Sequence, residues 1–402
     1  MIIDTDIIKK IQLEYGEAFY LLDSVQFEQN YRNLKKAFSA IYSNFNIAYS
    51  YKTNYTPKLC KIVNRLGGYA EVVSEMELEL ARRCGVKPEN IIWNGPIKEC
   101  EEERIFLLDG GTVNIDSLEE ALYIQKIAND TNEVLNVGIR CNFDVKDGVI
   151  SRFGLDVNGE EFDKTIEIIK GTNNIHLVGF HCHFAKRQID YWEARAQGII
   201  SVIEKTGIIP DRIDIGGGLY GNMENSLKKQ FESYIPSYIE YAEVVAPVIA
   251  NYFRDKEKKP ELIIEPGSAL VGDCMKLVAT VKTIKNIQGK AIASVLGSQK
   301  NISMSGVNPP MEVIPMGNER KKYENLDFVG YTCIESDTIY KGYTGDLSVG
   351  DVIVISNCGS YSLVMKPPFI LPNFPVLDIC NGNIEVIKKK EKFDDIFHTF
   401  VI

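Results

Sequence analysis

The sequence predicts an α/β protein made of a (β/α)8 TIM barrel and a C-terminal β domain, and two observations lead to this fold class. From about residue 45 to residue 267, short apolar runs alternate with amphipathic stretches. After about residue 270, turns join successive strand patterns and helical stretches become few. Eight strand–helix repeats with parallel strands close into a barrel, so we assign the first segment to that architecture.

Short apolar runs define the predicted barrel strands. They are Ile47–Tyr51, Tyr69–Val73, Ile91–Trp93, Thr112–Ile115, Leu135–Arg140, Leu177–His181, Arg212–Ile215 and Leu262–Ile264. Helical patterns separate them, for example Ser74–Arg83, Ser117–Ile127, Gly159–Ile169, Tyr191–Glu204 and Tyr234–Tyr252. At one helix start, Asp116 and Ser117 precede two glutamates, which is typical of a capped first turn. Because the second and third strands are short, a count of seven or nine strands stays open.

The C-terminal region is predicted to be an antiparallel β-barrel or sandwich. Its expected strands are Leu277–Ile284, Ala291–Val295, Phe328–Ile334, Val352–Ser356 and Ile384–Ile387. The apolar run Phe19–Leu22 precedes the first barrel helix and is able to add a strand to this domain. We therefore assign residues 25–268 to the barrel, and residues 1–24 and 269–402 to the β domain.

Composition narrows the class of protein. The chain has 402 residues, which is long enough for two domains with full-sized cores. Charged residues make up 25% of it and the formal net charge is −10. Apart from Lys388–Lys390, which we interpret as a solvated surface, no basic block stands out. Binding of nucleic acid through phosphate contacts is therefore not expected.

The cysteines and the N-terminus point to a cytoplasmic protein. Nine cysteines occur at irregular spacings without a CxxC pair, which argues against a disulfide framework and a zinc site. Met1–Gln12 mixes charged and apolar residues and lacks the apolar core of a signal peptide. No run approaches the length of a membrane span, so no membrane contact is expected.

The segment Tyr49–Asn54 contains the first candidate catalytic residue. The first strand ends where Lys52 begins, and Pro57 then starts a helix. An amine at the end of a buried strand is well placed to lose its proton in a partly desolvated pocket and to attack a carbonyl. A solvated lysine at a strand end is the alternative for this residue taken alone.

Glycines and polar residues follow later strands of the predicted barrel, whose ends face one shared pocket. Gly216–Gly218 follows strand seven, where bare backbone N–H groups can converge on a phosphate; a flexible turn is the alternative. Glu265 ends strand eight, where its carboxylate can pair with a protonated ring nitrogen or act as a structural cap. His181 and His183 face one side of a strand, so one imidazole can stack on a cofactor ring; the alternative is a core histidine. A metal site would need further ligands, so none is expected.

A lysine, a phosphate cradle, a carboxylate and a stacking imidazole on one barrel rim describe a pyridoxal-phosphate site. With these residues, the sequence resembles the fold-type-III pyridoxal-phosphate decarboxylases. This is the diaminopimelate/ornithine/arginine decarboxylase family, which has an alanine-racemase-like barrel. The matching segments are Tyr49–Asn54, Ala70–Glu77, Ser151–Gly154, Gly179–His183, Asp214–Gly218, Glu265–Gly267, Cys333–Asp337 and Gly359–Tyr361. They extend over most of the chain in the family's order and are specific as a set.

The resemblance implies a role for each matching residue. Lys52 would hold pyridoxal 5'-phosphate as a Schiff base, His183 would stack on its ring, and Glu265 would pair with the pyridinium nitrogen. Further cofactor-binding residues would be Gly217, Gly218, Gly267 and Tyr361. Cys333 would deliver a proton to the substrate carbanion after loss of carbon dioxide. In the family this cysteine comes from the partner subunit, which implies a homodimer with shared active sites.

Departures from the family pattern near the barrel rim concern anion binding. The family usually continues Glu-Pro-Gly with arginine, whereas here the residue is Ser268. The segment after the second histidine usually reads apolar-Gly-Ser and here reads Phe184–Arg187. We expect Lys186 or Arg187 to replace the lost contacts, either to phosphate or to a substrate carboxylate.

Departures in the β domain concern the far end of the substrate. The family's cysteine is usually followed by an acid that holds the distal amine of the substrate. Here the next residue is Ile334 and the acid, Glu335, comes one position later, where a strand would turn it to the other face. The segment Gly297–Pro310 also lacks the family's glycine-methionine-asparagine pattern.

These features predict a pyridoxal-phosphate-dependent decarboxylase of an amino acid or amino-acid derivative, which is free or linked to a carrier. A modified, acyl-linked or uncommon amino acid is favoured over diaminopimelate, lysine or ornithine. One alternative is a racemase or epimerase on the same fold, which would need two opposed acid/base groups. The other is a catalytically inactive homologue that binds the cofactor.

Overall fold

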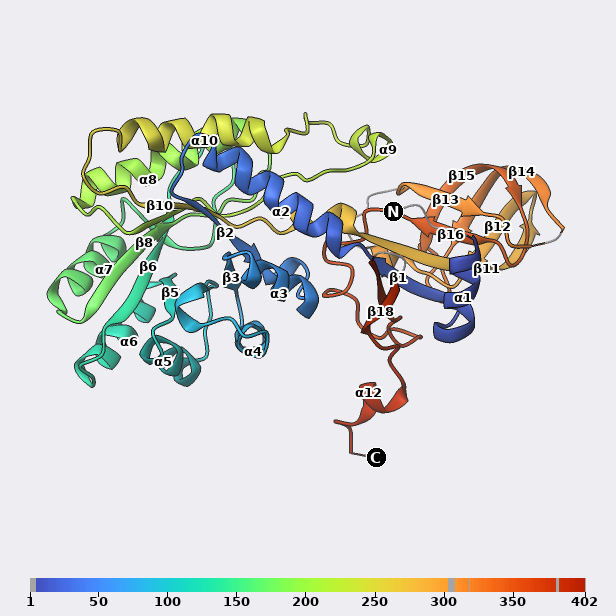
Figure 1. Ribbon diagram of the computed structural model, residues 1–402, viewed down its shortest axis with the longest axis horizontal. Helices are drawn as coiled ribbons and strands as arrows, with labels where there is room; N and C mark the ends of the chain where they lie inside the picture. Colours follow the sequence, from blue (N-terminus) through green and yellow to red (C-terminus); the bar gives the residue numbers. More distant parts are fainter. Residues whose placement is uncertain (1–4, 303–307, 318, 381–382, 402) are drawn as a thin grey trace. The chain divides into compact units, whose positions relative to one another are not determined.

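The computed structural model describes residues 5–302, 308–317, 319–380 and 383–401 (Figure 1). The chain forms two compact units. The unit that we call the β unit comprises Met1–Phe27, Asn222–Glu232 and Leu270–Ile402, and the barrel unit comprises Glu28–Gly221 and Ser233–Ala269. The segment Asn222–Glu232 thus groups with the β unit, although it lies within the sequence span predicted for the barrel.

Eight parallel strands of the barrel unit close into a ring. They are β2 (Phe45–Ser50), β3 (Tyr69–Val72), β4 (Ile91–Trp93), β5 (Thr112–Ile115), β6 (Leu135–Asn142), β8 (Ile175–His181), β9 (Arg212–Asp214) and β10 (Glu261–Ile264). Each pairs with the next in that order, and β10 pairs again with β2. A two-residue strand, β7 (Leu155–Asp156), pairs with β6 outside the ring. The predicted eight-stranded barrel is confirmed, including its short strands.

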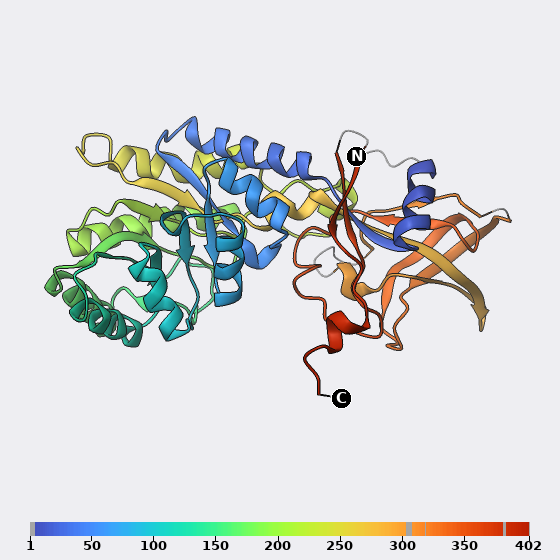
Figure 2. The ribbon, with the colours of Figure 1, turned by 60° about the horizontal axis from the view of Figure 1, so that its bottom comes forward.

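Helices surround the strands of the barrel unit (Figures 1 and 2). They are α2 (Ser24–Ser39, whose first turn belongs to the β unit), α3 (Pro57–Arg65), α4 (Glu75–Arg83), α5 (Cys100–Leu108), α6 (Leu118–Asn129), α7 (Glu160–Gly171), α8 (Trp192–Thr206) and α10 (Tyr238–Tyr252). The predicted cap at Ser117 is confirmed, because its side chain accepts a hydrogen bond from the Glu120 N–H. The helix α10 begins at a full capping box between Ser237 and Glu240.

Strand register brings polar side chains of neighbouring strands to one level. Arg140 of β6 is paired with His181 of β8, and His181 is paired with Asp214 of β9. At the same end of the ring, Ser50 of β2 is paired with Glu71 of β3. Because all eight strands are parallel, their carboxyl ends meet at one rim. The polar residues that end these strands therefore gather around one point.

The β unit is built on a mixed sheet. Its strands are β1 (Ala18–Leu22), β11 (Met275–Ile287), β12 (Lys290–Val295), β13 (Met311–Ile314), β14 (Lys321–Val329), β15 (Thr338–Leu347), β16 (Val352–Ile355), β17 (Val376–Cys380) and β18 (Asn383–Lys388). The apolar run at residues 19–22 does supply a strand, which pairs with β11 and β17. Most pairs are antiparallel as predicted, but β1–β17 and β12–β14 are parallel.

The predicted strand at residues 328–334 is correct only as far as Val329, where β14 ends. Residues 330–337 form a loop instead, because the buried Asp337 carboxylate collects hydrogen-bond donors from several segments. It accepts bonds from Thr332 Oγ1 at 2.6 Å and from the Gln299 N–H at 2.7 Å. Glu335 therefore lies in a turn, and the strand-alternation argument for its direction does not apply.

Several elements were not predicted. The helices α1 (Thr5–Tyr15) and α12 (Phe393–Phe397) and the strands β13, β15 and β17 belong to this group. Within the segment 297–310, residues 303–307 lie outside the described residues. Among the helices that are described, none is long and apolar enough to cross a membrane.

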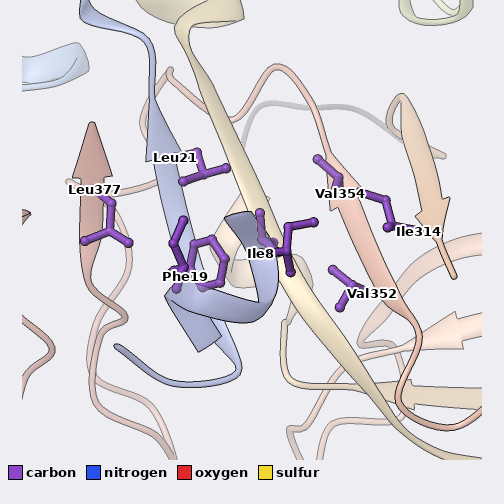
Figure 3. Packing of buried hydrophobic residues seen from close by; sticks show 9 residues of the cluster. Ile8, Phe19, Leu21, Ile314, Val352, Val354 and Leu377 are labelled. Atoms are coloured by element: carbon purple, nitrogen blue, oxygen red, sulfur yellow. The ribbon is translucent and has the colours of Figure 1, made fainter. Parts of the chain in front are cut away.

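An apolar cluster holds the helix α1 against the sheet of the β unit (Figure 3). Its buried members are Ile8, Ile11, Phe19, Leu21, Val278, Ile314, Val352, Val354 and Leu377. They come from both ends of the sequence, so the N-terminal segment and the C-terminal strands share one core.

We expect Phe19→Ala to lower the free energy of unfolding of the β unit by about 3–5 kcal/mol, because it leaves a cavity in this cluster. Phe19 is fully buried, whereas Leu13 on α1 is 91% exposed. The control Leu13→Ala should change the same free energy by less than about 0.5 kcal/mol. Denaturant unfolding followed by circular dichroism measures both, and equal effects would contradict the assignment of this core.

Candidate active site

Lys52 lies just beyond β2, in a short 3-10 turn (Tyr51–Thr53) at the carboxyl rim of the barrel. The Ser50 N–H donates to the Pro266 carbonyl at 3.3 Å, which ties the end of β2 to the segment after β10. The Lys52 ammonium lies 2.7 and 2.9 Å from the two carboxylate oxygens of Glu71. Its side chain is 33% exposed, whereas that of Glu71 is fully buried. The Lys52 amine therefore reaches the rim of the barrel, and the buried Glu71 carboxylate balances its positive charge.

A continuous set of hydrogen bonds runs from Lys52 to Glu265. Glu71 Oε1 accepts a bond from Asn94 Nδ2 at 3.0 Å, and the same amide nitrogen donates to Glu265 Oε1 at 2.5 Å. Asn114 Nδ2 donates to Asn94 Oδ1 at 2.7 Å, which fixes the orientation of the Asn94 amide. Two residues thus connect the first-strand amine to the last-strand carboxylate.

Glu265 is held as an anion in the centre of this network. Burial alone raises the pKa of a carboxyl group, but the His181 imidazole and the Lys52 ammonium outweigh burial and lower the pKa of Glu265 well below its ordinary value. The neighbouring Asp214 behaves in the opposite way, because burial and the Glu265 charge raise its pKa well above the usual range. Of these two carboxyl groups, Asp214 therefore has the stronger tendency to hold a proton and Glu265 the stronger tendency to be ionised.

The two histidines approach Glu265 from the end of β8. His181 is buried and its Nε2 lies 3.3 Å from Glu265 Oε2. His183 follows the end of the strand, keeps a 30% exposed side chain and has its Nδ1 3.9 Å from the same oxygen. The Gly217 N–H donates to His183 Nδ1 at 2.9 Å, so that nitrogen carries no proton. Desolvation and the nearby Lys52 charge lower the pKa of His183 well below its ordinary value, so the ring is neutral.

The three ligand atoms of His181, Asp214 and Glu265 lie within 4.8 Å of one another. A metal ion could use such a spacing. In this structure, however, His181 Nε2 already lies 3.3 Å from Glu265 Oε2, and burial together with the Glu265 charge raises the pKa of Asp214, which disfavours the carboxylate form that would bind a metal ion.

The glycine turn after β9 requires residues without side chains. Gly216 and Gly218 have φ angles of 73° and 90°, which disfavour other residues. A Cβ atom on Gly217 would lie 2.1 Å from the Glu265 carbonyl oxygen. The Glu265 N–H donates to the Gly216 carbonyl at 2.9 Å, which joins the turn to the end of β10. The turn can therefore approach the Glu265 backbone only because its residues are glycines.

Two consecutive backbone donors of this turn remain available. The N–H groups of Gly216 and Gly217 donate to Asp214 and to His183. Those of Gly218 and Leu219 have no acceptor among the residues that the structure describes. Adjacent unpaired N–H groups form a concave anion site, or nest. A phosphate group could therefore accept hydrogen bonds from the N–H groups of Gly218 and Leu219, whereas the Gly217 N–H is already bonded to His183.

The remaining rim residues flank the glycine turn. Gly267 packs so closely that a Cβ on it would lie 2.0 Å from Thr53 Oγ1. Ser268 begins the short helix α11 (Ser268–Val271). The Arg187 side chain passes the turn, with its Cγ 4.0 Å from the place where a Gly218 side chain would begin. Lys186 contributes a carbonyl that accepts a hydrogen bond from Arg195 at 2.7 Å.

The other predicted site residues lie in the β unit. Cys333 is an exposed thiol in the loop between β14 and β15, followed by Ile334, which is 41% exposed. Glu335 is exposed in the same loop. Tyr361 has a φ angle of 62°, which a tyrosine rarely adopts and which marks a constrained backbone.

Four residues of the barrel site were missed in the sequence. Glu71, Asn94 and Asp214 each lie at or next to the carboxyl end of a barrel strand, which is the signal that could have identified them. Arg195 lies on the helix α8 and reaches the rim from outside the ring of strands. No pattern in the sequence distinguishes it from a surface arginine.

These groups fit pyridoxal phosphate. Lys52 offers an amine for the aldehyde, the ionised Glu265 offers a partner for a protonated ring nitrogen, and the free N–H groups of Gly218 and Leu219 offer donors for a phosphate. The unpaired N–H of Leu219 is a direct sign of an anion site, because Leu219 is buried and buried backbone N–H groups rarely lack an acceptor.

Comparison with known proteins gives an independent view. The family model for the pyridoxal binding domain of pyridoxal-dependent decarboxylases matches residues 24–272, more than half of the chain. The diaminopimelate decarboxylase of Aquifex aeolicus is 26% identical over 409 residues, covering 97% of this chain and 93% of that protein. The L-glutamyl-(BtrI acyl-carrier protein) decarboxylase of Niallia circulans is 27% identical over 436 residues, covering 99% and 97%.

Solved structures show the same fold. A diaminopimelate decarboxylase from M. jannaschii in complex with L-lysine superimposes with a TM-score of 0.83 at 23% identity, covering 98% of this chain and 94% of that one. A lysine decarboxylase from Selenomonas ruminantium has a TM-score of 0.72 at 19% identity, covering 94% and 96%. With the family model matched over most of the barrel unit, the chain belongs to the family of pyridoxal-dependent decarboxylases.

Proposed function

We propose that the protein removes the α-carboxylate of an amino acid or amino-acid derivative, with Lys52 as the residue that attaches the cofactor. The hydrogen-bonded path from Lys52 to Glu265 is the observation that carries this proposal, because it sets an amine and an ionised carboxylate at its two ends. Pyridoxal phosphate, when bound, supplies an electron sink for the electron pair that remains when carbon dioxide leaves.

Different residues around Lys52 and Glu265 are proposed to bind the cofactor and to transfer protons. Glu71 orients the Lys52 amine and is placed to hold the proton that the amine must lose before it attacks a carbonyl. Glu265 keeps a pyridine nitrogen protonated through its own negative charge. The neutral imidazole of His183 presents a flat face without competing for that proton. The N–H groups of Gly218 and Leu219 are the proposed donors to the phosphate, and the family resemblance adds Gly267 and Tyr361 as proposed cofactor-binding residues.

Cys333 is proposed to return a proton to the α-carbon. Its thiol is exposed, and the loop that carries it is fixed by hydrogen bonds from Thr332 to Asp337. In the family that this sequence resembles, the corresponding cysteine comes from the partner subunit, and this supports our proposal of a homodimer with shared sites. None of the nine cysteines, all of which lie in the described part of the chain, forms a disulfide, which supports a reducing cytoplasm as the working compartment.

The substrate is proposed to be an amino acid without a free distal ammonium group. Ile334 follows Cys333 and is partly exposed, so this position offers an apolar surface instead of a carboxylate. The similarity to the Niallia circulans enzyme, whose name specifies a glutamyl group on an acyl-carrier protein, supports an acyl-linked substrate. Lys186, Arg187, Ser268 and Glu335 are the proposed further substrate contacts.

A substrate panel tests this function. The protein with pyridoxal phosphate is incubated with diaminopimelate, lysine, ornithine, arginine and glutamate, and with glutamate or other amino acids acylated to a phosphopantetheine thiol. Carbon dioxide release and optical rotation are followed. We expect release from an acyl-linked amino acid at a kcat/KM at least about 10-fold above that of the free diamino acids. Loss of optical activity without carbon dioxide release would contradict decarboxylation and indicate a racemase, and neither change would indicate an inactive homologue.

We expect Lys52→Ala to abolish covalent attachment of the cofactor without unfolding the protein, because Lys52 is the amine at the barrel rim. Borohydride reduction of the protein with pyridoxal phosphate, followed by peptide mass mapping, measures the attachment. The matched control is Lys61→Ala on the exposed side of α3, which should leave the mass increase on the Lys52 peptide unchanged. A modified peptide that persists in the Lys52 variant would show that another lysine is the attachment point.

We expect Glu265→Gln to lower kcat by on the order of 10²-fold or more, because a neutral amide cannot keep the ring nitrogen protonated. Glu261→Gln, at the other end of the same strand, removes an equal charge and should retain kcat within a few-fold. Steady-state rates at saturating substrate give both values. Near-normal turnover of the Glu265 variant would refute its role.

A further inference from the structure

Arg195 is a fully buried cation beside the glycine turn. It lies in the first turn of α8, and its guanidinium donates to three backbone carbonyls. Nη1 bonds the Gly217 oxygen at 2.7 Å, while Nη2 bonds the oxygens of Lys186 and Phe184 at 2.7 and 3.2 Å. The guanidinium also lies 4.1 Å from the centre of the Trp192 ring. These contacts immobilise the side chain.

The positive charge of Arg195 has no carboxylate partner within ion-pair distance among the described residues. Its Nε also lacks a hydrogen-bond acceptor there. Burial lowers the pKa of Arg195 to about 10, so the group still carries its charge at neutral pH. A buried charge without a counter-ion is unfavourable, and an anion bound nearby would offset that cost.

The bond to Gly217 also sets the direction of the neighbouring donor. A trans peptide group is planar, so its C=O and N–H point to opposite sides. Because the Gly217 carbonyl points at Arg195, the N–H of Gly218 points away from it and stays free of acceptors in the described chain. Arg195 Nη2 lies only 3.9 Å from the place where a Gly218 side chain would begin. The Arg195 charge therefore lies next to the residue that carries the free donor, on the opposite side of the peptide group.

We propose that Arg195 is the positioning residue of the phosphate subsite: it holds the glycine turn with the Gly218 N–H free and supplies the fixed positive charge that the phosphate group requires. This proposal rests on the proposed function and assigns to Arg195 the anion role that the sequence suggested for Lys186 or Arg187. Ser268, at the start of α11, carries no charge, and the Arg187 guanidinium lies 5.8 Å from the Tyr220 ring centre. Only Arg195 bonds the backbone of the turn among these residues.

The experiment compares the dissociation constants of pyridoxal phosphate and of pyridoxal, which lacks the phosphate. Both form the same covalent bond to the protein, so the Kd of pyridoxal divided by the Kd of pyridoxal phosphate isolates the contribution of the phosphate group. We expect Arg195→Gln to reduce this ratio by about 10- to 100-fold through weaker binding of pyridoxal phosphate, with little change for pyridoxal. Arg195→Lys keeps the positive charge, so it should lower this ratio much less than Arg195→Gln does.

Controls separate a charge effect from loss of structure. Arg212→Gln removes an arginine at the opposite end of β9 and should leave the ratio unchanged. Circular dichroism and thermal unfolding establish that each variant is folded. If Arg195→Gln does not fold, Arg195→Met is used in its place, because methionine keeps an apolar side-chain stem against Trp192. An unchanged ratio in a folded neutral variant, or an equal weakening for pyridoxal, would overturn the proposal. Failure of the natural protein to bind pyridoxal phosphate at all would instead refute the proposed function.

Discussion

The buried negative charge of Glu265 is the constraint on which the rest of the site depends. A carboxylate that is almost fully removed from water must be satisfied by hydrogen bonds and nearby positive charge. Here Asn94 and His181 bond its oxygens, and the nearby Lys52 ammonium, which is bonded to Glu71, adds positive charge. These groups come from different strands or from the residues that directly follow them, and the closed parallel barrel with this register brings them together.

The same constraint explains the arrangement of the rim. The backbone of Glu265 bonds Gly216, and the glycine turn in turn bonds His183 and Arg195. The glycine turn, with its unpaired Gly218 N–H, is therefore held in place relative to the carboxylate by a short chain of backbone and side-chain bonds. A flat, charged cofactor needs its ring nitrogen and its phosphate bound at a fixed separation, and under the proposed function this connection would provide that separation.

Much of this arrangement could be predicted from the sequence. The periodic apolar runs predict all eight barrel strands, and strand ends with polar residues identify Lys52, His183, Glu265 and the glycine turn. Glu71 was overlooked, although an acid inside a short buried strand signals a specific partner. Arg195 could not have been found, because its role arises from helix α8 packing against the turn and not from any spacing along the chain.

The β unit shows where sequence patterns fail. Alternation predicted a strand through Ile334, but the buried Asp337 collects donors from distant segments and turns residues 330–337 into a loop. Parallel pairing of β1 with β17 joins segments from the two ends of the chain, and no local pattern encodes such a pairing. Tertiary hydrogen bonds, rather than local propensity, therefore determine how Cys333 and Ile334 are presented.

A crystal structure of the protein with pyridoxal phosphate tests the central claim most directly. We expect electron density for the cofactor continuous with Lys52 Nζ, a ring nitrogen within hydrogen-bond distance of a Glu265 oxygen, and the phosphate against the N–H groups of Gly218 and Leu219. A cofactor bound away from Glu265, or with its phosphate remote from the glycine turn, would contradict that claim.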